Sequence, residues 1–192
     1  CGSIDTDAIK AAVGAPAVKA VVLAMGIDSA IEGEGHDRTD IRFPGQQAAL
    51  VQAVLDTVQN KGVRVVLLLF NGGTIAIEEL KYAPMAIVEC WYPGATGGRA
   101  IAEALFGFNG SNRFGKLPFT YYAYNFTLAS PMNNMNMSAN TGGPGRSYKY
   151  LADSSLALWP FGFGLSYTTF SLSQHTIDMP RAVLRALPPW AT

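Results

Sequence analysis

The feature that most constrains this chain is an alternation of short apolar runs with stretches of helical periodicity. The apolar runs cover residues 21–25, 63–70 and 85–90, and each is followed by a turn that contains glycine. An apolar stripe at three- and four-residue steps predicts a helix over residues 45–60, and a second helix is predicted over residues 99–106. Short apolar runs are typical of strands that are covered on both faces. Alternating strands and helices therefore predict an α/β fold with a mostly parallel sheet flanked by helices.

The two ends of the chain differ from this pattern. Residues 5–15 combine an Asp or Thr cap with Ala and Val at helical spacing, which predicts a short helix before the first strand. Residues 109–159 are rich in Gly, Asn, Pro, Ser and Tyr, without helical periodicity, and predict a long irregular C-terminal wrap with a flexible centre at residues 133–145. The aromatic and glycine residues of 159–170 are expected to pack in a core or between domains.

Composition excludes two classes of partner. The 192 residues are 49% hydrophobic and 15% charged, with a formal net charge of zero, as in an ordinary globular domain. Without a basic excess the chain has no means of holding a phosphate backbone, so we expect no nucleic-acid partner. The apolar runs are shorter than about 10 residues, so we expect no membrane partner either.

The first residues, the cysteines and the histidines carry weaker information. The chain starts without Met and without a signal-peptide pattern, so we expect a piece of a longer chain. Cys1 and Cys90 are compatible with one disulfide, with two buried thiols, or with cysteine partners elsewhere. His36 and His175 are far apart in sequence and have no cysteines at ligand spacing, so we expect no metal and no cofactor.

Three N-x-[ST] sequons stand in polar, loop-like surroundings, at Asn109, Asn125 and Asn136. Such a cluster favours a secreted, extracellular glycoprotein. The alternative is a chance occurrence in a stretch that is rich in Asn and Ser.

Charge is concentrated in the loop that follows the first apolar run. Its charged or titratable side chains are Asp28, Glu32, Glu34, His36, Asp37 and Arg38. Ligands of open α/β sheets bind beyond the carboxyl ends of the strands, where this loop would lie. The loop is therefore a candidate site, and the alternative is a solvated connection without chemistry.

Four separated sequence words occur in an order that is similar to one enzyme family. They are EGHDR with FPGQQ (residues 34–47), CWYPG (90–94), GKLP (115–118) and FGFGLSYTTF (161–170). Together they resemble the second, α/β-sandwich domain of glycoside hydrolase family 3, the family of β-glucosidases, β-xylosidases and related exo-acting enzymes. The CWYPG word looks most like the β-xylosidase and α-arabinofuranosidase branch. The resemblance implies that residues 1–170 form this domain, and that residues 171–192 are a linker or the truncated start of a fibronectin type III-like domain.

The resemblance also implies roles for the charged loop. Retaining glycosidases use two carboxyl groups about 5–5.5 Å apart, one as nucleophile and one as acid/base. In the resembled family the nucleophile is an aspartate of the barrel domain, and the acid/base is a glutamate from the second domain. Glu34 matches that glutamate, and Glu32 competes because a two-residue step in an extended loop puts both carboxylates on one side. Asp37 and Arg38 are candidate substrate-binding residues, whereas His36 is expected to pack in the loop.

The chain lacks the barrel-domain words of the family, so half of the catalytic pair is missing. We therefore expect part of a retaining exo-acting β-glycosidase that hydrolyses O-glycosidic bonds of oligosaccharides or aryl glycosides. It would need the N-terminal barrel domain of the same protein and would be inactive alone. One alternative is a non-catalytic carbohydrate-binding domain that uses Trp91, Tyr92 and Trp159 for stacking. The other is a structural α/β domain, such as a nucleotide binder, although Asn71-Gly72-Gly73 lacks a phosphate-binding pattern.

Overall fold

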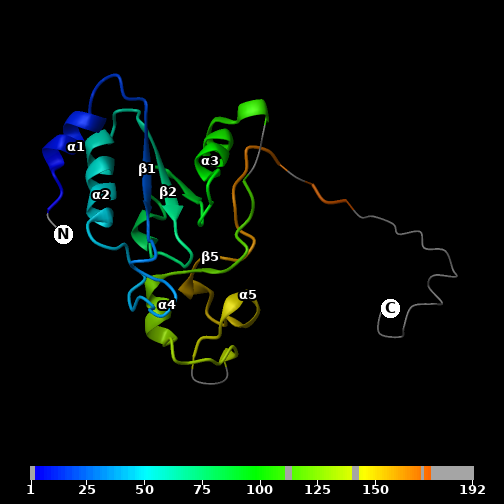
Figure 1. The fold of residues 1–192 in the computed structure, drawn as a ribbon. Helices are drawn as coiled ribbons and strands as arrows, with labels where there is room; N and C mark the ends of the chain where they lie inside the picture. Colours follow the sequence, from blue (N-terminus) through cyan, green and yellow to red (C-terminus); the bar gives the residue numbers. More distant parts are fainter. Residues whose placement is uncertain (1–2, 111–113, 140–142, 170, 174–192) are drawn as a thin grey trace.

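The structure is a computed structural model that describes residues 3–110, 114–139, 143–169 and 171–173. It consists of an α/β body followed by a region of short elements (Figure 1). The main sheet of the body has three strands in the order β1-β2-β3, and both strand pairs are parallel. The strands are β1 (Ala20–Gly26), β2 (Arg64–Phe70) and β3 (Ala86–Glu89). The predicted α/β fold with a parallel sheet is confirmed.

Three helices accompany the sheet. They are α1 (Thr6–Val13), α2 (Gln47–Val58) and α3 (Gly97–Phe106). In Figure 1, α1 and α2 lie together beside β1, and α3 lies on the opposite side of the sheet, beyond β2. Helix α1 begins after Asp5, whose carboxylate accepts hydrogen bonds from two backbone N–H groups of the first turn. The helices therefore flank the sheet as the sequence predicts.

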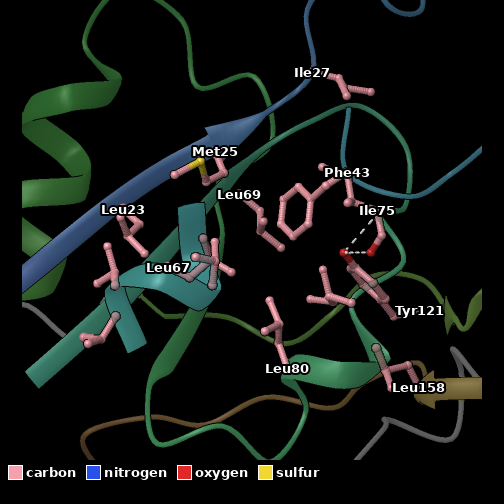
Figure 2. Packing of buried hydrophobic residues seen from close by; sticks show 14 of the residues in the cluster. Leu23, Met25, Ile27, Phe43, Leu67, Leu69, Ile75, Leu80, Tyr121 and Leu158 are labelled. Atoms are coloured by element: carbon pink, nitrogen blue, oxygen red, sulfur yellow. Dashed lines mark hydrogen bonds between the residues drawn. The ribbon is translucent and has the colours of Figure 1, made fainter. Parts of the chain in front are cut away.

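The hydrophobic core forms where α2 packs on the sheet. Leu23 and Met25 of β1 lie opposite Leu67 and Leu69 of β2 in the parallel register. Residues two apart in a strand point to the same face, so these four side chains form one apolar surface (Figure 2). The side of α2 that joins this core carries Val51, Val54 and Val58.

The other face of β1 differs from the prediction. The apolar run at residues 21–25 predicts a strand covered on both faces, and this prediction is wrong for β1. Val22 is 48% exposed, and Ala20 and Ala24 are also exposed. The physical reason is that the core lies against one face of β1: Leu23 and Met25 join it, whereas Ala20, Val22 and Ala24 point to the opposite face, which the described residues leave open.

The region after α3 is the predicted irregular wrap, and it contains short elements that periodicity did not predict. They are η2 (Phe108–Gly110), β4 (Tyr121–Tyr122), α4 (Tyr124–Ala129), α5 (Ser147–Tyr150), η4 (Ser154–Leu156) and β5 (Ala157–Trp159), with η1 (Glu78–Leu80) lying earlier, in the body. Strands β4 and β5 pair antiparallel. Helices of six and four residues are too short to show a repeating apolar stripe, which explains why they were missed.

The aromatic and glycine stretch packs back onto the chain around β4. The backbone of Leu117 exchanges hydrogen bonds of 2.8 Å with Phe163 and Gly162. The Trp159 ring lies edge-on to the Tyr121 ring, with 5.4 Å between the centroids. Of residues 171–192, the predicted linker or further domain, only 171–173 lie within the described residues.

Several other sequence features can be placed. Cys90 is a half-buried free thiol, and Cys1 lies outside the described residues. The described helices include none with the length and apolar character that a bilayer crossing requires.

Tyr121 joins the C-terminal region to the α/β body. Its side chain is only 1% exposed, and its hydroxyl donates to the carbonyl oxygen of Ile75 at 2.9 Å and accepts from the Ile75 N–H at 3.3 Å (Figure 2). Both backbone groups of one buried residue are thus satisfied by a single side chain from 46 residues away.

Replacing Tyr121 by Phe should therefore destabilise the chain. Tyr121→Phe keeps the ring but leaves the buried N–H and C=O of Ile75 without that partner, so we expect the free energy of unfolding to fall by about 1–3 kcal/mol. Urea denaturation of the 192-residue chain measures this change. Tyr82→Phe is the matched control, because Tyr82 is 89% exposed, and it should change stability by less than about 0.5 kcal/mol. Equal effects of the two variants would contradict the prediction.

Candidate active site

The charged loop starts from a fixed point at the end of β1. The side-chain amide of Gln47, the first residue of α2, donates to the Gly26 carbonyl and accepts from the Gly26 N–H, each at 2.8 Å. A Cβ at Gly26 would lie 1.9 Å from the carbonyl oxygen of Phe70, so only glycine fits there. The last Gln of the FPGQQ word therefore has a structural role, which is to fix the backbone from which the loop departs.

The loop then forms a small hairpin with Glu34 at its tip. Gly33 and His36 exchange two backbone hydrogen bonds of 3.1 Å, and Glu34 and Gly35 form the turn between them. Gly35 has φ 88°, in the region that favours glycine. The Glu34 side chain is exposed, and no hydrogen bond or ion pair reaches its carboxylate from the described residues. The hairpin thus holds this carboxylate out from the protein surface.

Glu32 has different surroundings. Its Oε2 lies 3.0 Å from Nε of Arg38, whose side chain is only 8% exposed. The Arg38 Nη2 also donates to the carbonyl oxygen of Thr74 at 2.6 Å. Glu32 therefore neutralises a buried guanidinium at the base of the hairpin, whereas Glu34 lies at its tip.

The remaining loop residues divide in the same way. Asp37 and His36 are exposed. The Arg38 side chain is buried, and neither its Nε nor its Nη1 has a hydrogen-bond partner among the described residues, so Nε meets Glu32 as an ion pair only. Of the two residues predicted to bind substrate, Asp37 lies on the surface and Arg38 lies beneath the loop.

A further carboxyl group, Glu89, was missed by the sequence analysis. It ends β3, and its Oε2 accepts a hydrogen bond from Nδ2 of Asn71 at 3.2 Å, while its Oε1 accepts from the Trp91 N–H at 3.3 Å. Burial raises the pKa of Glu89 from 4.5 to about 7. The available signal was a charged residue at the end of an apolar run, immediately before the CWYPG word.

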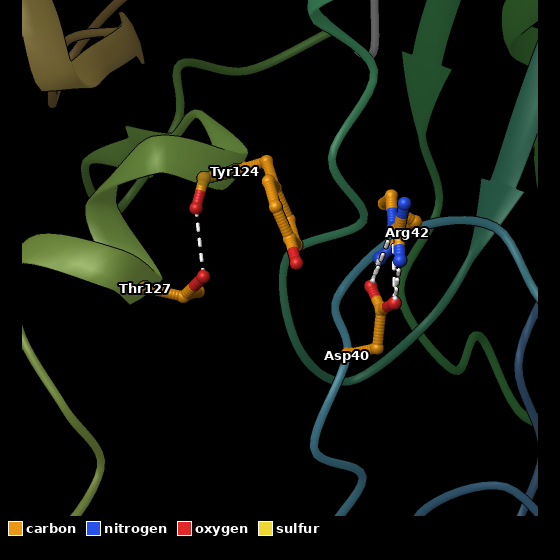
Figure 3. Close-up of polar contacts among 4 residues, drawn as sticks. All are labelled: Asp40, Arg42, Tyr124 and Thr127. Carbon is orange, nitrogen blue, oxygen red and sulfur yellow. Dashed lines mark hydrogen bonds and ion pairs between the residues drawn. The ribbon is translucent and has the colours of Figure 1, made fainter.

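A hollow lined in part by charged residues does not include Glu34. Its volume is about 350 Å³, and its walls include Asp40, Arg42, Glu78, Glu79 and Tyr124. Asp40 forms an ion pair with Arg42, which holds the pKa of Asp40 below its usual value (Figure 3). The Arg42 guanidinium lies 4.9 Å from the centroid of the Tyr124 ring. The hollow and the Glu34 tip are therefore separate features of the surface.

Two of the aromatic residues considered for sugar stacking pack within the protein. The Trp91 ring lies 5.0 Å from the Phe119 ring, edge-on, and Trp159 packs on Tyr121 as described above. Tyr92 is exposed, and its ring covers Gly72, where an added Cβ would lie 2.8 Å from the ring. Side chains of the protein itself therefore lie against this loop at Gly72 and Gly73.

The sequons lie in the C-terminal region. Asn125, in α4, and Asn136 are exposed. Asn109 lies in η2.

The raised pKa of Glu89 predicts a pH-dependent stability. Between about pH 4.5 and 7 the folded chain keeps a proton that the unfolded chain has released, so the free energy of unfolding should fall as the pH rises through this range, by roughly 3 kcal/mol. Glu89→Gln should remove this contribution. Urea denaturation of both chains at pH 4.5 and pH 8 tests it. Between these two pH values, the free energy of unfolding should fall more for the unmodified chain than for Glu89→Gln. If the two chains differed in free energy of unfolding by the same amount at both pH values, the raised pKa of Glu89 would be contradicted.

Comparisons with known proteins agree with the α/β fold. Residues 5–167 match the model of the glycosyl hydrolase family 3 C-terminal domain. Beta-D-xylosidase 1 of Arabidopsis thaliana is 42% identical over 80% of this chain and 19% of its own length. Beta-xylosidase/alpha-L-arabinofuranosidase 2 of Medicago sativa subsp. varia is 38% identical over 81% of this chain and 20% of its own length.

Solved structures give the same result. A GH3 exo-β-xylosidase in complex with a xylobiose aziridine activity-based probe matches with a TM-score of 0.71 and 30% identity, over 87% of this chain and 21% of that chain. A β-glucosidase from Kluyveromyces marxianus in complex with glucose matches with a TM-score of 0.68 and 27% identity, over 89% and 20% of the two chains. The chain spans about a fifth of the length of these relatives. It belongs to the family of glycosyl hydrolase family 3 C-terminal domains.

Proposed function

We propose that this chain is the part of a retaining, exo-acting β-glycosidase of β-xylosidase type that supplies the acid/base carboxyl group, and that this group is Glu34. The observation that carries the proposal is the position of Glu34 at the tip of a short hairpin, exposed and free of protein partners among the described residues. A general acid must reach the leaving-group oxygen of a substrate, so its carboxyl has to be accessible. The relatives described as β-xylosidases support the substrate class.

The chemistry needs two carboxyl groups. In the first step a carboxylate attacks the anomeric carbon while Glu34 gives its proton to the glycosidic oxygen, and the bond to the departing group breaks. In the second step the Glu34 carboxylate takes a proton from water, whose oxygen attacks the anomeric carbon and releases the sugar. The nucleophilic carboxylate belongs, in this proposal, to a barrel domain of the same protein.

The base of the hairpin suits this role because it fixes the tip. Arg38 is held from two sides, by the Glu32 carboxylate at 3.0 Å and by the Thr74 carbonyl at 2.6 Å. An acid/base group displaced by about 1 Å can cost a large factor in rate, so a rigid base is a functional requirement. In this proposal Glu32 and Arg38 maintain the loop, and Asp37, exposed beside the tip, binds a sugar hydroxyl.

The setting of the protein is part of the same proposal. Oligosaccharides or aryl glycosides are the substrates, and the barrel domain completes the sugar pocket. Exposed sequons at Asn125 and Asn136 support a secreted glycoprotein.

Removing the Glu34 carboxyl should impair catalysis in a characteristic way. In the full-length glycosidase, Glu34→Ala should lower kcat/KM on xylobiose by about 10²–10⁴-fold, because the leaving oxygen is no longer protonated. The loss should be smaller on 2,4-dinitrophenyl β-xyloside, whose leaving group departs without protonation. Added azide should raise turnover of that substrate and give a xylosyl azide, since a small anion can attack the glycosyl-enzyme without a general base.

Glu32→Gln is the matched control for this experiment. It should weaken the hairpin base without producing a xylosyl azide. If Glu32→Gln gave the azide product and Glu34→Ala did not, the acid/base role would belong to Glu32. If neither variant did so, the proposal for this loop would be wrong.

The isolated 192-residue chain should show no glycosidase turnover, because a single carboxylic acid cannot perform a double displacement. Incubation with 4-nitrophenyl β-xyloside, followed by absorbance, measures this. Release of nitrophenol at an enzymatic rate, unaffected by Glu34→Ala, would overturn the two-domain assignment.

A further inference from the structure

We propose that Glu89 is a positioning residue for the Glu34 hairpin, acting through Asn71 and the loop of residues 72–74. The inference rests on the proposed function of Glu34 and extends it to a carboxyl group at the end of a different strand. Three consecutive steps connect the two residues.

The first contact orients Asn71. This side chain is fully buried, and its Nδ2 donates to two acceptors, Oε2 of Glu89 at 3.2 Å and the carbonyl oxygen of Gly73 at 2.9 Å. An amide that bridges a carboxyl and a backbone carbonyl has little rotational freedom. Glu89 therefore fixes the direction in which the Asn71 amide holds the Gly73 backbone.

The second contact joins this loop to Arg38. The Thr74 carbonyl accepts from Nη2 of Arg38 at 2.6 Å. A Cβ on Gly73 would lie 3.0 Å from Arg38 Nη2 and 3.5 Å from Glu32 Oε2. The loop backbone thus packs close to both members of the ion pair, and a side chain at position 73 would press on the Arg38 guanidinium.

The third step is along the chain, from the ion pair to the hairpin. Glu32 immediately precedes Gly33, which opens the two-hydrogen-bond ladder around Glu34. When the Glu89 carboxyl is removed, Asn71 loses one of its two acceptors and the loop of residues 72–74 loses its fixed position. Arg38 and Glu32 then lose their support, and the tip carrying Glu34 becomes less well placed.

Proteolysis of the 192-residue chain tests the structural half of the proposal. Trypsin cleaves after Arg38 only when its buried side chain is released. We therefore expect Glu89→Ala to accelerate cleavage after Arg38 severalfold, and mass spectrometry measures the rate. Cleavage after Arg64 in β2 and Arg99 in α3 should keep its rate. Glu79→Ala is the control variant, because Glu79 is exposed and outside these contacts. Equal acceleration at all three sites would mean general destabilisation and would overturn the proposal.

Kinetics of the full-length glycosidase test the functional half. Glu89→Ala should lower kcat on xylobiose by about tenfold, with little change in KM. On 2,4-dinitrophenyl β-xyloside, kcat should fall by less than about twofold, because a misplaced acid affects only the substrate whose leaving group needs protonation. Glu89→Gln, which keeps the shape and one acceptor, should recover most of the activity. Equal losses on both substrates, or no loss, would overturn the positioning role.

The two proposals fail in distinguishable ways. If Glu34→Ala showed no leaving-group dependence, the acid/base assignment would be wrong, and the cleavage after Arg38 would still decide whether Glu89 controls the hairpin base. If Glu34→Ala showed this dependence but Glu89→Ala did not, the acid/base assignment would stand and the positioning role would be wrong.

Discussion

A buried guanidinium is the constraint on which the candidate site depends. Arg38 carries a full charge at 8% exposure, and leaving such a group without a counter-charge and acceptors would be costly. The Glu32 carboxylate supplies the counter-charge and the Thr74 carbonyl accepts one hydrogen bond, and in doing so they join the loop after β1 to the loop after β2. Because neighbouring parallel strands end at the same edge of the sheet, this pairing turns two separate loops into one supported surface.

The structure places two carboxyl groups in opposite environments at this edge. Glu34 is exposed at a hairpin tip, whereas Glu89 is largely buried, hydrogen-bonded, and has its pKa raised to about 7. Both groups are glutamate carboxyls, so it is their environment that makes one accessible to a ligand and the other a structural hydrogen-bond acceptor. In our interpretation the exposed carboxyl performs chemistry, and the buried one keeps it in position.

The strands, the helices and the charged loop could be predicted because their signals are local. Apolar periodicity marks β2 and α2, and the words around Glu34 and Gln47 indicate the family. Burial depends on neighbours far along the chain. The exposure of Val22 and the hydrogen bond between Asn71 and Glu89 could therefore not be predicted from the sequence. The two-residue spacing of Glu32 and Glu34 gave no sign of the turn that separates their surroundings.

The contacts of Tyr121 have a consequence for the order of folding. The segment after β2 is held at Ile75 by Tyr121, and the Glu78 carboxylate accepts from the Tyr124 N–H at 2.9 Å. Both contacts span 46 residues, so their loop-closure entropy must be overcome after the local helices have formed. During synthesis the sheet, whose strands all precede residue 90, can therefore assemble before Tyr121 and Tyr124 are available to hold Ile75 and Glu78.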